Sequence, residues 1–202
     1  MTHQFFLDKR PHNGLTYEEF INKSKKRIES IEPSQLDENE KGLFEYTKLN
    51  LHRSSRVDKT FKVNENLCNA IKSITKPQIW MVITEDWCGD SAQNLPYIAK
   101  IASCNPLIDL RIILRDENLD IMDLYLTNGK SRSIPKLVVF DKEGNELMQW
   151  GPRPKEAQDL VNKAKEENLP KNEFIEKLHL FYGKNRGKAL EEEFNNLFIS
   201  PS

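Results

Sequence analysis

A chain of 202 residues with 38% hydrophobic residues can bury one substantial core, and 30% charged residues are typical of a soluble protein. Its 30 basic and 31 acidic residues are mixed along the chain, so no field of one sign exists to attract nucleic acid or an anionic membrane. No window reaches the roughly 18 apolar residues of a spanning helix, and the first eight residues do not resemble a signal peptide. We therefore expect a cytoplasmic protein that binds neither nucleic acid nor membrane.

Cysteine and histidine are sparse. Three cysteines, Cys68, Cys88 and Cys104, argue against a disulfide scaffold and suit a reducing compartment. None of the four histidines pairs with a cysteine at metal-ligand spacing. We assign no metal site and expect no cofactor.

Residues 1–60 are predicted to form an N-terminal helical extension. Residues 16–19 (Thr-Tyr-Glu-Glu) are typical of a capping box, and an apolar stripe then continues until Pro33 ends the helix. A second helix is expected from about Gln35 to His52, with four residues facing inward: Leu43, Phe44, Thr47 and Leu51.

Residues 61–168 are predicted to form an α/β domain in the order α-β-α-β-α-β-β-α. A helix capped by Asn64 precedes a buried strand at 79–84. The later elements are a helix after Cys88, a strand at 107–114, a short helix at 119–126, a hairpin at 136–150 and a helix after Pro154. This alternation predicts a mixed sheet covered by helices.

Residues 169–202 are predicted to form a C-terminal extension of two amphipathic helices, interrupted at 183–187. These helices can pack on the central domain or form a homodimer interface, and the sequence leaves both arrangements open.

The segment Trp87-Cys88-Gly89-Asp90-Ser91 places a cysteine between a buried strand and a helix. The free N–H groups and the dipole of the first helical turn favour a thiolate at Cys88. Asp90 or Ser91 can cap this turn. Ser91 stands where a second cysteine would complete a redox pair.

Two prolines strengthen the case for this segment. Pro96 lies eight residues after Cys88 inside the expected helix, where it would kink the chain. Pro135 follows Ile134 just before an apolar strand, a setting in which an X–Pro bond can be cis.

Together, Trp-Cys-Gly before a helix, the kinking proline and Ile-Pro before the hairpin resemble the thioredoxin superfamily over residues 61–168. The resemblance implies a thioredoxin-like fold, a central mixed sheet flanked by helices, here with helical extensions at both ends. It also implies that Ile134 and Pro135 flank the catalytic Cys88. With Trp87, Gly89 and Asp90, they would form the substrate-binding groove.

The chain departs from dithiol members of that superfamily at two positions. Ser91 cannot resolve a mixed disulfide, because a hydroxyl is no comparable nucleophile toward sulfur. Val82 stands where those members bury an acidic residue. Cys104 follows Cys88 by sixteen residues, about 24 Å along a helix, which is too far for a disulfide. The distance of Cys68 from Cys88 cannot be read from the sequence, and we interpret Cys68 and Cys104 as small buried hydrophobic residues.

Opposing charges surround Cys88. The carboxylates of Glu85, Asp86 and Asp90 disfavour a thiolate by about as much as the helix dipole favours it. A hydrogen bond from Ser91 would tip this balance toward activation, which makes Ser91 the second catalytic candidate. Arg153, expected at the same end of the sheet, is either an auxiliary residue or an ordinary solvated arginine.

The leading hypothesis is a monothiol, thioredoxin-like thiol–disulfide oxidoreductase. Cys88 would attack a protein or low-molecular-weight disulfide, and an external thiol or partner would complete the exchange. Two alternatives stay open: a redox-inactive binding module of the same fold, and a peroxide or thiol sensor.

Overall fold

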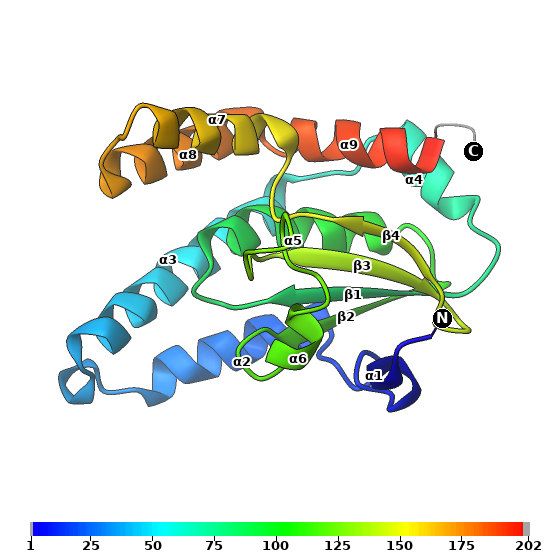
Figure 1. Ribbon diagram of the computed structural model, residues 1–202, viewed down its shortest axis with the longest axis horizontal. Helices are drawn as coiled ribbons and strands as arrows, with labels where there is room; N and C mark the ends of the chain where they lie inside the picture. Colours follow the sequence, from blue (N-terminus) through cyan, green and yellow to red (C-terminus); the bar gives the residue numbers. More distant parts are fainter. Residues whose placement is uncertain (1, 200–202) are drawn as a thin grey trace.

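Figure 1 shows the computed structural model, which describes residues 2–199. A four-stranded mixed sheet forms its centre, with strand order β2-β1-β3-β4. The strands are β1 (Gln78–Thr84), β2 (Ile108–Leu114), β3 (Lys136–Asp141) and β4 (Glu146–Trp150). β1 is parallel to β2 and antiparallel to β3, and β3 and β4 form the expected hairpin. The predicted α/β architecture is confirmed.

Both faces of the sheet are buried, which explains the continuously apolar sequence of β1. Trp80 and Val82 face one hydrophobic core, whereas Met81 and Ile83 face the other. The helices connected to the sheet are α4 (Glu65–Lys72), α5 (Gly89–Ala102), α6 (Leu119–Met122) and α7 (Lys155–Glu166). α6 ends at Met122, short of the predicted Leu126, because the chain turns there through Tyr125 N–H to Met122 C=O.

The N-terminal part contains α1 (Gln4–Leu7), α2 (Tyr17–Ser30), a 3-10 turn at Pro33–Gln35 and α3 (Glu38–Thr60). The predicted capping box is present at Thr16 and Glu19. α3 continues eight residues beyond the predicted end at His52, and its added turns bury Val57 against the core. Phe44 and Thr47 are buried as expected, but Leu43 is 37% exposed, so its predicted inward orientation is wrong.

The C-terminal part contains the two predicted helices, α8 (Lys171–Asn185) and α9 (Lys188–Ile199). α9 lies beside α4 and packs Phe194 against Trp80 and Trp150. The Trp150 indole N–H donates to Glu193 at 2.6 Å. α9 therefore packs on the central domain, the first of the two arrangements that the sequence left open. Within residues 2–199, no helix is long and apolar enough to cross a membrane.

Cys68 and Cys104 form a disulfide, with Cα atoms 5.5 Å apart. This corrects the interpretation of both as reduced, buried hydrophobic residues, and it removes the support that the cysteine count gave to a reducing compartment. The bond joins α4 to the loop after α5, where Asn105 also donates to the carbonyl oxygens of Ile71 and Ile74 at 2.8 Å. The disulfide lies at the opposite end of α5 from Cys88, so neither Cys68 nor Cys104 can attack a mixed disulfide formed at Cys88.

Denatured without reductant, the protein should take up one alkylating group, at Cys88, and after reduction it should take up three. Cys104→Ala should lower the free energy of unfolding by about 3 kcal/mol, because the disulfide restrains the unfolded chain. Intact mass and urea titration measure these effects, with Cys88→Ala as the matched control. Uptake of three groups before reduction would contradict the assignment of the disulfide.

Candidate active site

Cys88 lies where the sequence places it, between β1 and α5. It is half-buried and serves as the N-cap residue of α5, rather than Asp90 or Ser91. Because Ile83 pairs with Lys136 across β1 and β3, the turn before β3 lies beside the C-terminal end of β1. The Cys88 thiol donates to the Ile134 carbonyl oxygen at 3.3 Å, and the Ile134–Pro135 peptide bond is cis.

The pKa of Cys88 is raised above its ordinary value, mainly by burial and then by the Asp90 carboxylate. Hydrogen bonds from the Ser91 hydroxyl and from the Ser91 and Asp90 amides act in the opposite direction, because they stabilise the thiolate. The sequence predicted two nearly cancelling effects with Ser91 deciding between them. Burial was missing from that balance and outweighs the hydrogen bonds.

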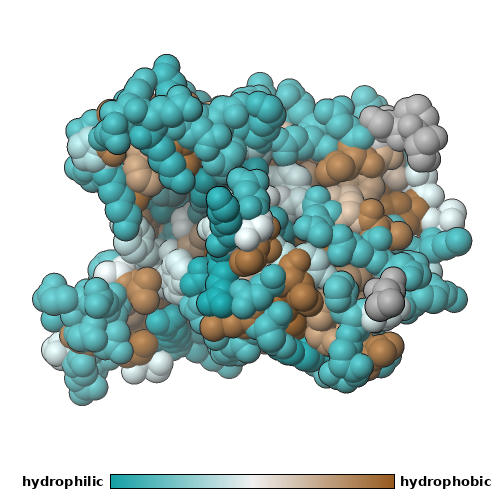
Figure 2. All heavy atoms as spheres, in the orientation of Figure 1, coloured by the Kyte–Doolittle hydropathy of each residue, from teal (hydrophilic) through white to brown (hydrophobic). Residues whose placement is uncertain are grey.

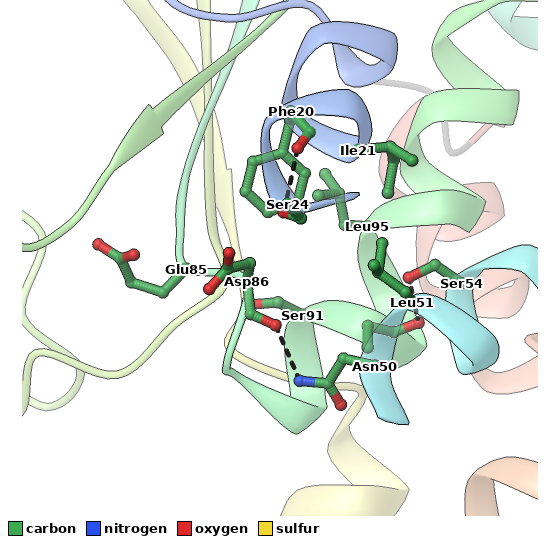
Figure 3. Close-up of a pocket in the computed structure, with 11 residues that line it drawn as sticks. Phe20, Ile21, Ser24, Asn50, Leu51, Ser54, Glu85, Asp86, Ser91 and Leu95 are labelled. Atoms are coloured by element: carbon green, nitrogen blue, oxygen red, sulfur yellow. Dashed lines mark hydrogen bonds between the residues drawn. The ribbon is translucent and has the colours of Figure 1, made fainter. Parts of the chain in front are cut away.

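The Ser91 side chain is held beneath this loop and is 2% exposed. The Thr84 hydroxyl donates to Ser91 Oγ at 2.5 Å. Since that bond fills an acceptor position of Ser91, the Ser91 proton stays available for the Cys88 sulfur. Behind Ser91 lies a cavity of only about 10 Å³, enclosed by α2, α3 and α5 (Figure 3).

Asp90 forms a buried ion pair with Arg153, which follows β4. Arg153 Nε lies 3.2 Å from Asp90 Oδ2, and the second Arg153 nitrogen, Nη2, contacts the same oxygen. The Arg153 and Asp90 side chains are 16% and 11% exposed, so Arg153 is not an ordinary solvated arginine. The chain returns to this end of the sheet through Gly151. This residue has φ +112°, and its Cα lies so close to the Pro135 carbonyl oxygen that a Cβ would not fit, so the position requires glycine.

α8 also contacts Asp90, and the sequence did not predict this contact. The Tyr182 hydroxyl donates to Asp90 Oδ1 at 2.6 Å, and Asn94 donates to the Tyr182 oxygen at 3.2 Å. His179 packs over Gly89 so closely that a Cβ there would lie 3.0 Å from its ring. Burial and the nearby Arg53 lower the pKa of His179 to about 4, so its imidazole is neutral at neutral pH.

Trp87 and Glu85 flank the site on the strand side. The Trp87 ring is half-buried, and the Arg115 guanidinium lies 4.8 Å from its centroid, a cation–π contact. Glu85 is buried and accepts a hydrogen bond from the Asp116 amide at 2.8 Å. Burial raises the pKa of Glu85 to about 7. A buried acid therefore lies three residues before Cys88 in the chain, but its carboxylate accepts from the Asp116 amide and does not line the cavity at Cys88.

A cavity of about 350 Å³ opens onto the Cys88 loop between α3 and α8. It brings together Trp87, Cys88, Gly89, Asp90 and Arg153 with side chains from both helical extensions. Sequence reasoning missed the helical contributors because amphipathic spacing shows which residues share a face, but not which partner that face meets.

A mixed sheet with a cysteine at a strand–helix junction beside a cis-proline turn defines a thioredoxin-like protein. In agreement with this, the sequence model of the family described as Thioredoxin matches residues 37–166, and the chain belongs to that family. The match includes the whole of α3 as well as the sheet.

Two solved structures resemble nearly the whole chain. A protein of unknown function from Pseudomonas aeruginosa has 18% identity and a TM-score of 0.62, over 94% of this chain and 92% of its own. An HIV epitope-scaffold has 17% identity and a TM-score of 0.56, over 95% and 96%. At such identities these likenesses show the fold alone. No curated protein matches the chain.

Asp90→Asn should lower the pKa of Cys88, because it removes the nearby negative charge and leaves Arg153 free to stabilise the thiolate. Ser91→Ala should raise this pKa, because it removes a donor. The pH dependence of the alkylation rate measures both shifts, and Asp109→Asn, an exposed carboxylate on β2, is the control. An unchanged pKa in both variants would contradict the described electrostatics.

Glu85 should make folding stability depend on pH. The pKa of Glu85 is raised to about 7 in the folded state, so the folded protein holds the Glu85 proton more tightly than the unfolded chain does. The resulting contribution to the free energy of unfolding is complete below about pH 4.5 and is lost as the pH rises through about 7. Urea titration of the wild type and Glu85→Gln across this range measures the effect. The difference in free energy of unfolding between the two proteins should change with pH over this window; a constant difference would show that Glu85 titrates normally.

Proposed function

We propose that this protein carries out thiol–disulfide exchange at Cys88 and depends on an external thiol or partner protein to finish the reaction. One observation carries the proposal: the Cys88 sulfur lies at the N-terminus of α5 and 3.3 Å from the Ile134 carbonyl, with a hydroxyl, Ser91, in the position of a resolving thiol. The Cys68–Cys104 disulfide at the far end of α5 leaves Cys88 as the one free cysteine within residues 2–199.

The exchange has two displacements. In the first, the Cys88 thiolate attacks one sulfur of a substrate disulfide, the substrate S–S bond breaks, and one substrate thiolate leaves and takes up a proton. In the second, an external thiolate attacks the substrate sulfur of the mixed disulfide. A new disulfide leaves, and the Cys88 thiolate is regenerated.

Deprotonation of Cys88 also changes the substrate groove. The thiol donates to the Ile134 carbonyl in the resting state, and this hydrogen bond ends when the proton leaves. The Ile134 carbonyl then becomes free to accept a hydrogen bond from an extended substrate, with Pro135, Trp87 and Gly89 beside it. The Ser91 hydroxyl and the amides of residues 90 and 91 stabilise the thiolate that forms.

A redox-inactive binding module is the second candidate, and the raised pKa of Cys88 favours it. A thiol that stays protonated at neutral pH reacts slowly, whereas a groove can bind a partner without reacting. The same raised pKa counts against a peroxide sensor, because such sensors use accessible thiols of low pKa. The cytoplasmic location and a homodimer through the terminal helices stay predictions.

Oxidised glutathione should add one glutathione to the wild type, at Cys88, and none to Cys88→Ala. The adduct should persist until reduced glutathione is added. Ser91→Cys should instead release the adduct and accumulate an internal disulfide between Cys88 and the introduced thiol, which then lies one helical turn away. Intact mass and peptide mapping measure these products. Absence of any Cys88 adduct, even above the pKa of a free thiol, would leave only the binding module.

A further inference from the structure

The cavity over Cys88 is built by parts of the chain that lie outside the sheet. α3 contributes Leu43 and Tyr46, and α8 contributes Phe174, Ile175, Leu178 and His179. Figure 1 shows α3 and α8 diverging on the side where β1 ends, and Figure 2 shows that the molecular surface is hollowed on the same side. The extensions therefore form a pocket whose floor carries the reactive thiol.

The charged groups that line the cavity near the thiol are compensated within the protein, and the neighbouring Arg53, which lies behind Gly89, donates to the Asn50 side chain. Asp90 is paired with Arg153 and accepts from Tyr182, and the His179 imidazole is neutral at neutral pH. Lys171 also lines the cavity, but its side chain is exposed. A charged ligand group near the sulfur would lose hydration, and among the residues that line the cavity only the exposed Lys171 is uncommitted.

Apolar side chains of α3 line the cavity and are partly exposed to solvent instead of being buried in a hydrophobic core. Leu43 is 37% exposed and Tyr46 is 44% exposed, although both belong to a helix that packs firmly on α5 through other residues. The volume of about 350 Å³ is within the range of small-molecule pockets. A ligand of that size would remove these side chains from water, and this burial would supply its binding energy.

We propose that this pocket binds the apolar substituent of a low-molecular-weight disulfide whose sulfur reacts with Cys88. The inference rests on the proposed exchange reaction and narrows its substrate class. The substituent occupies the space between α3 and α8, and its sulfur reaches the floor formed by Cys88 and Gly89.

A series of alkyl methanethiosulfonates tests this proposal, because every member has the same leaving group. The Cys88 thiolate attacks the alkyl-bearing sulfur, the S–S bond breaks, and methanesulfinate leaves with the electron pair. The product is an alkyl disulfide on Cys88. In the wild type the second-order rate constant should rise by roughly threefold for each added methylene from methyl to pentyl, as chain carbons become buried.

Leu43→Ala and Ile175→Ala should flatten this dependence on chain length, and Leu43→Trp should block the long reagents while the methyl reagent still reacts. Two matched controls change exposed leucines of the same helices outside the pocket. Leu49→Ala on α3 and Leu180→Ala on α8, 45% and 56% exposed in the wild type, should keep the wild-type slope. Circular dichroism checks that each variant is folded.

Rates independent of chain length in the wild type, or slopes lowered equally by the control variants, would overturn the pocket assignment. The proposed exchange reaction fails by a different result. It is refuted if Cys88 forms no adduct with either oxidised glutathione or an uncharged dialkyl disulfide, whatever the thiosulfonate series shows.

Discussion

The buried Asp90 carboxylate ties the thiol, the sheet and the C-terminal helices to one another. It lies two residues after Cys88 and raises the pKa of the thiol. It is held by Arg153 from the end of the hairpin and by Tyr182 from α8. A buried carboxylate is tolerated only when it is paired in this way, and the bond from Tyr182 holds α8 at the site together with the packing of α8 on α7. The pocket between α3 and α8 is in turn a consequence of where α8 is held.

The thiol has two sets of neighbours with opposite effects. Burial and Asp90 keep the thiol protonated, and it donates to the Ile134 carbonyl oxygen, whereas the Ser91 hydroxyl and two backbone amides stabilise the thiolate once it forms. Such a cysteine is unreactive while it is protonated and becomes nucleophilic when its proton is removed. The arrangement suits a protein that forms a lasting mixed disulfide and waits for a second thiol, because no other thiol within residues 2–199 lies near enough to displace the substrate.

Local patterns in the sequence predicted the parts of the structure that depend on local physics. The apolar run at 79–84, the capping box at Thr16 and the hairpin after Pro135 each depend on neighbouring residues, and all three are present. The positions of Cys88 and Ile134 followed from the resemblance to thioredoxins, which fixes how this turn meets this helix.

The features that the sequence missed depend on how distant elements pack. Cys68 and Cys104 meet because α4 lies against the end of α5, which no spacing rule in either helix shows. Tyr182 reaches Asp90 across 92 residues, and Leu43 faces a cavity because α3 packs on α5 through other residues. The same packing buries Cys88, and burial decided a pKa that charge counting left balanced.

The central claim is that Cys88 starts an exchange that the chain cannot finish alone. The most direct test is the rate at which glutathione leaves the Cys88 adduct, followed by intact mass as the concentration of reduced glutathione is varied. The account predicts a rate proportional to that concentration, which extrapolates to zero when no thiol is added. A finite rate without added thiol would show that the protein resolves its own mixed disulfide and would contradict the account.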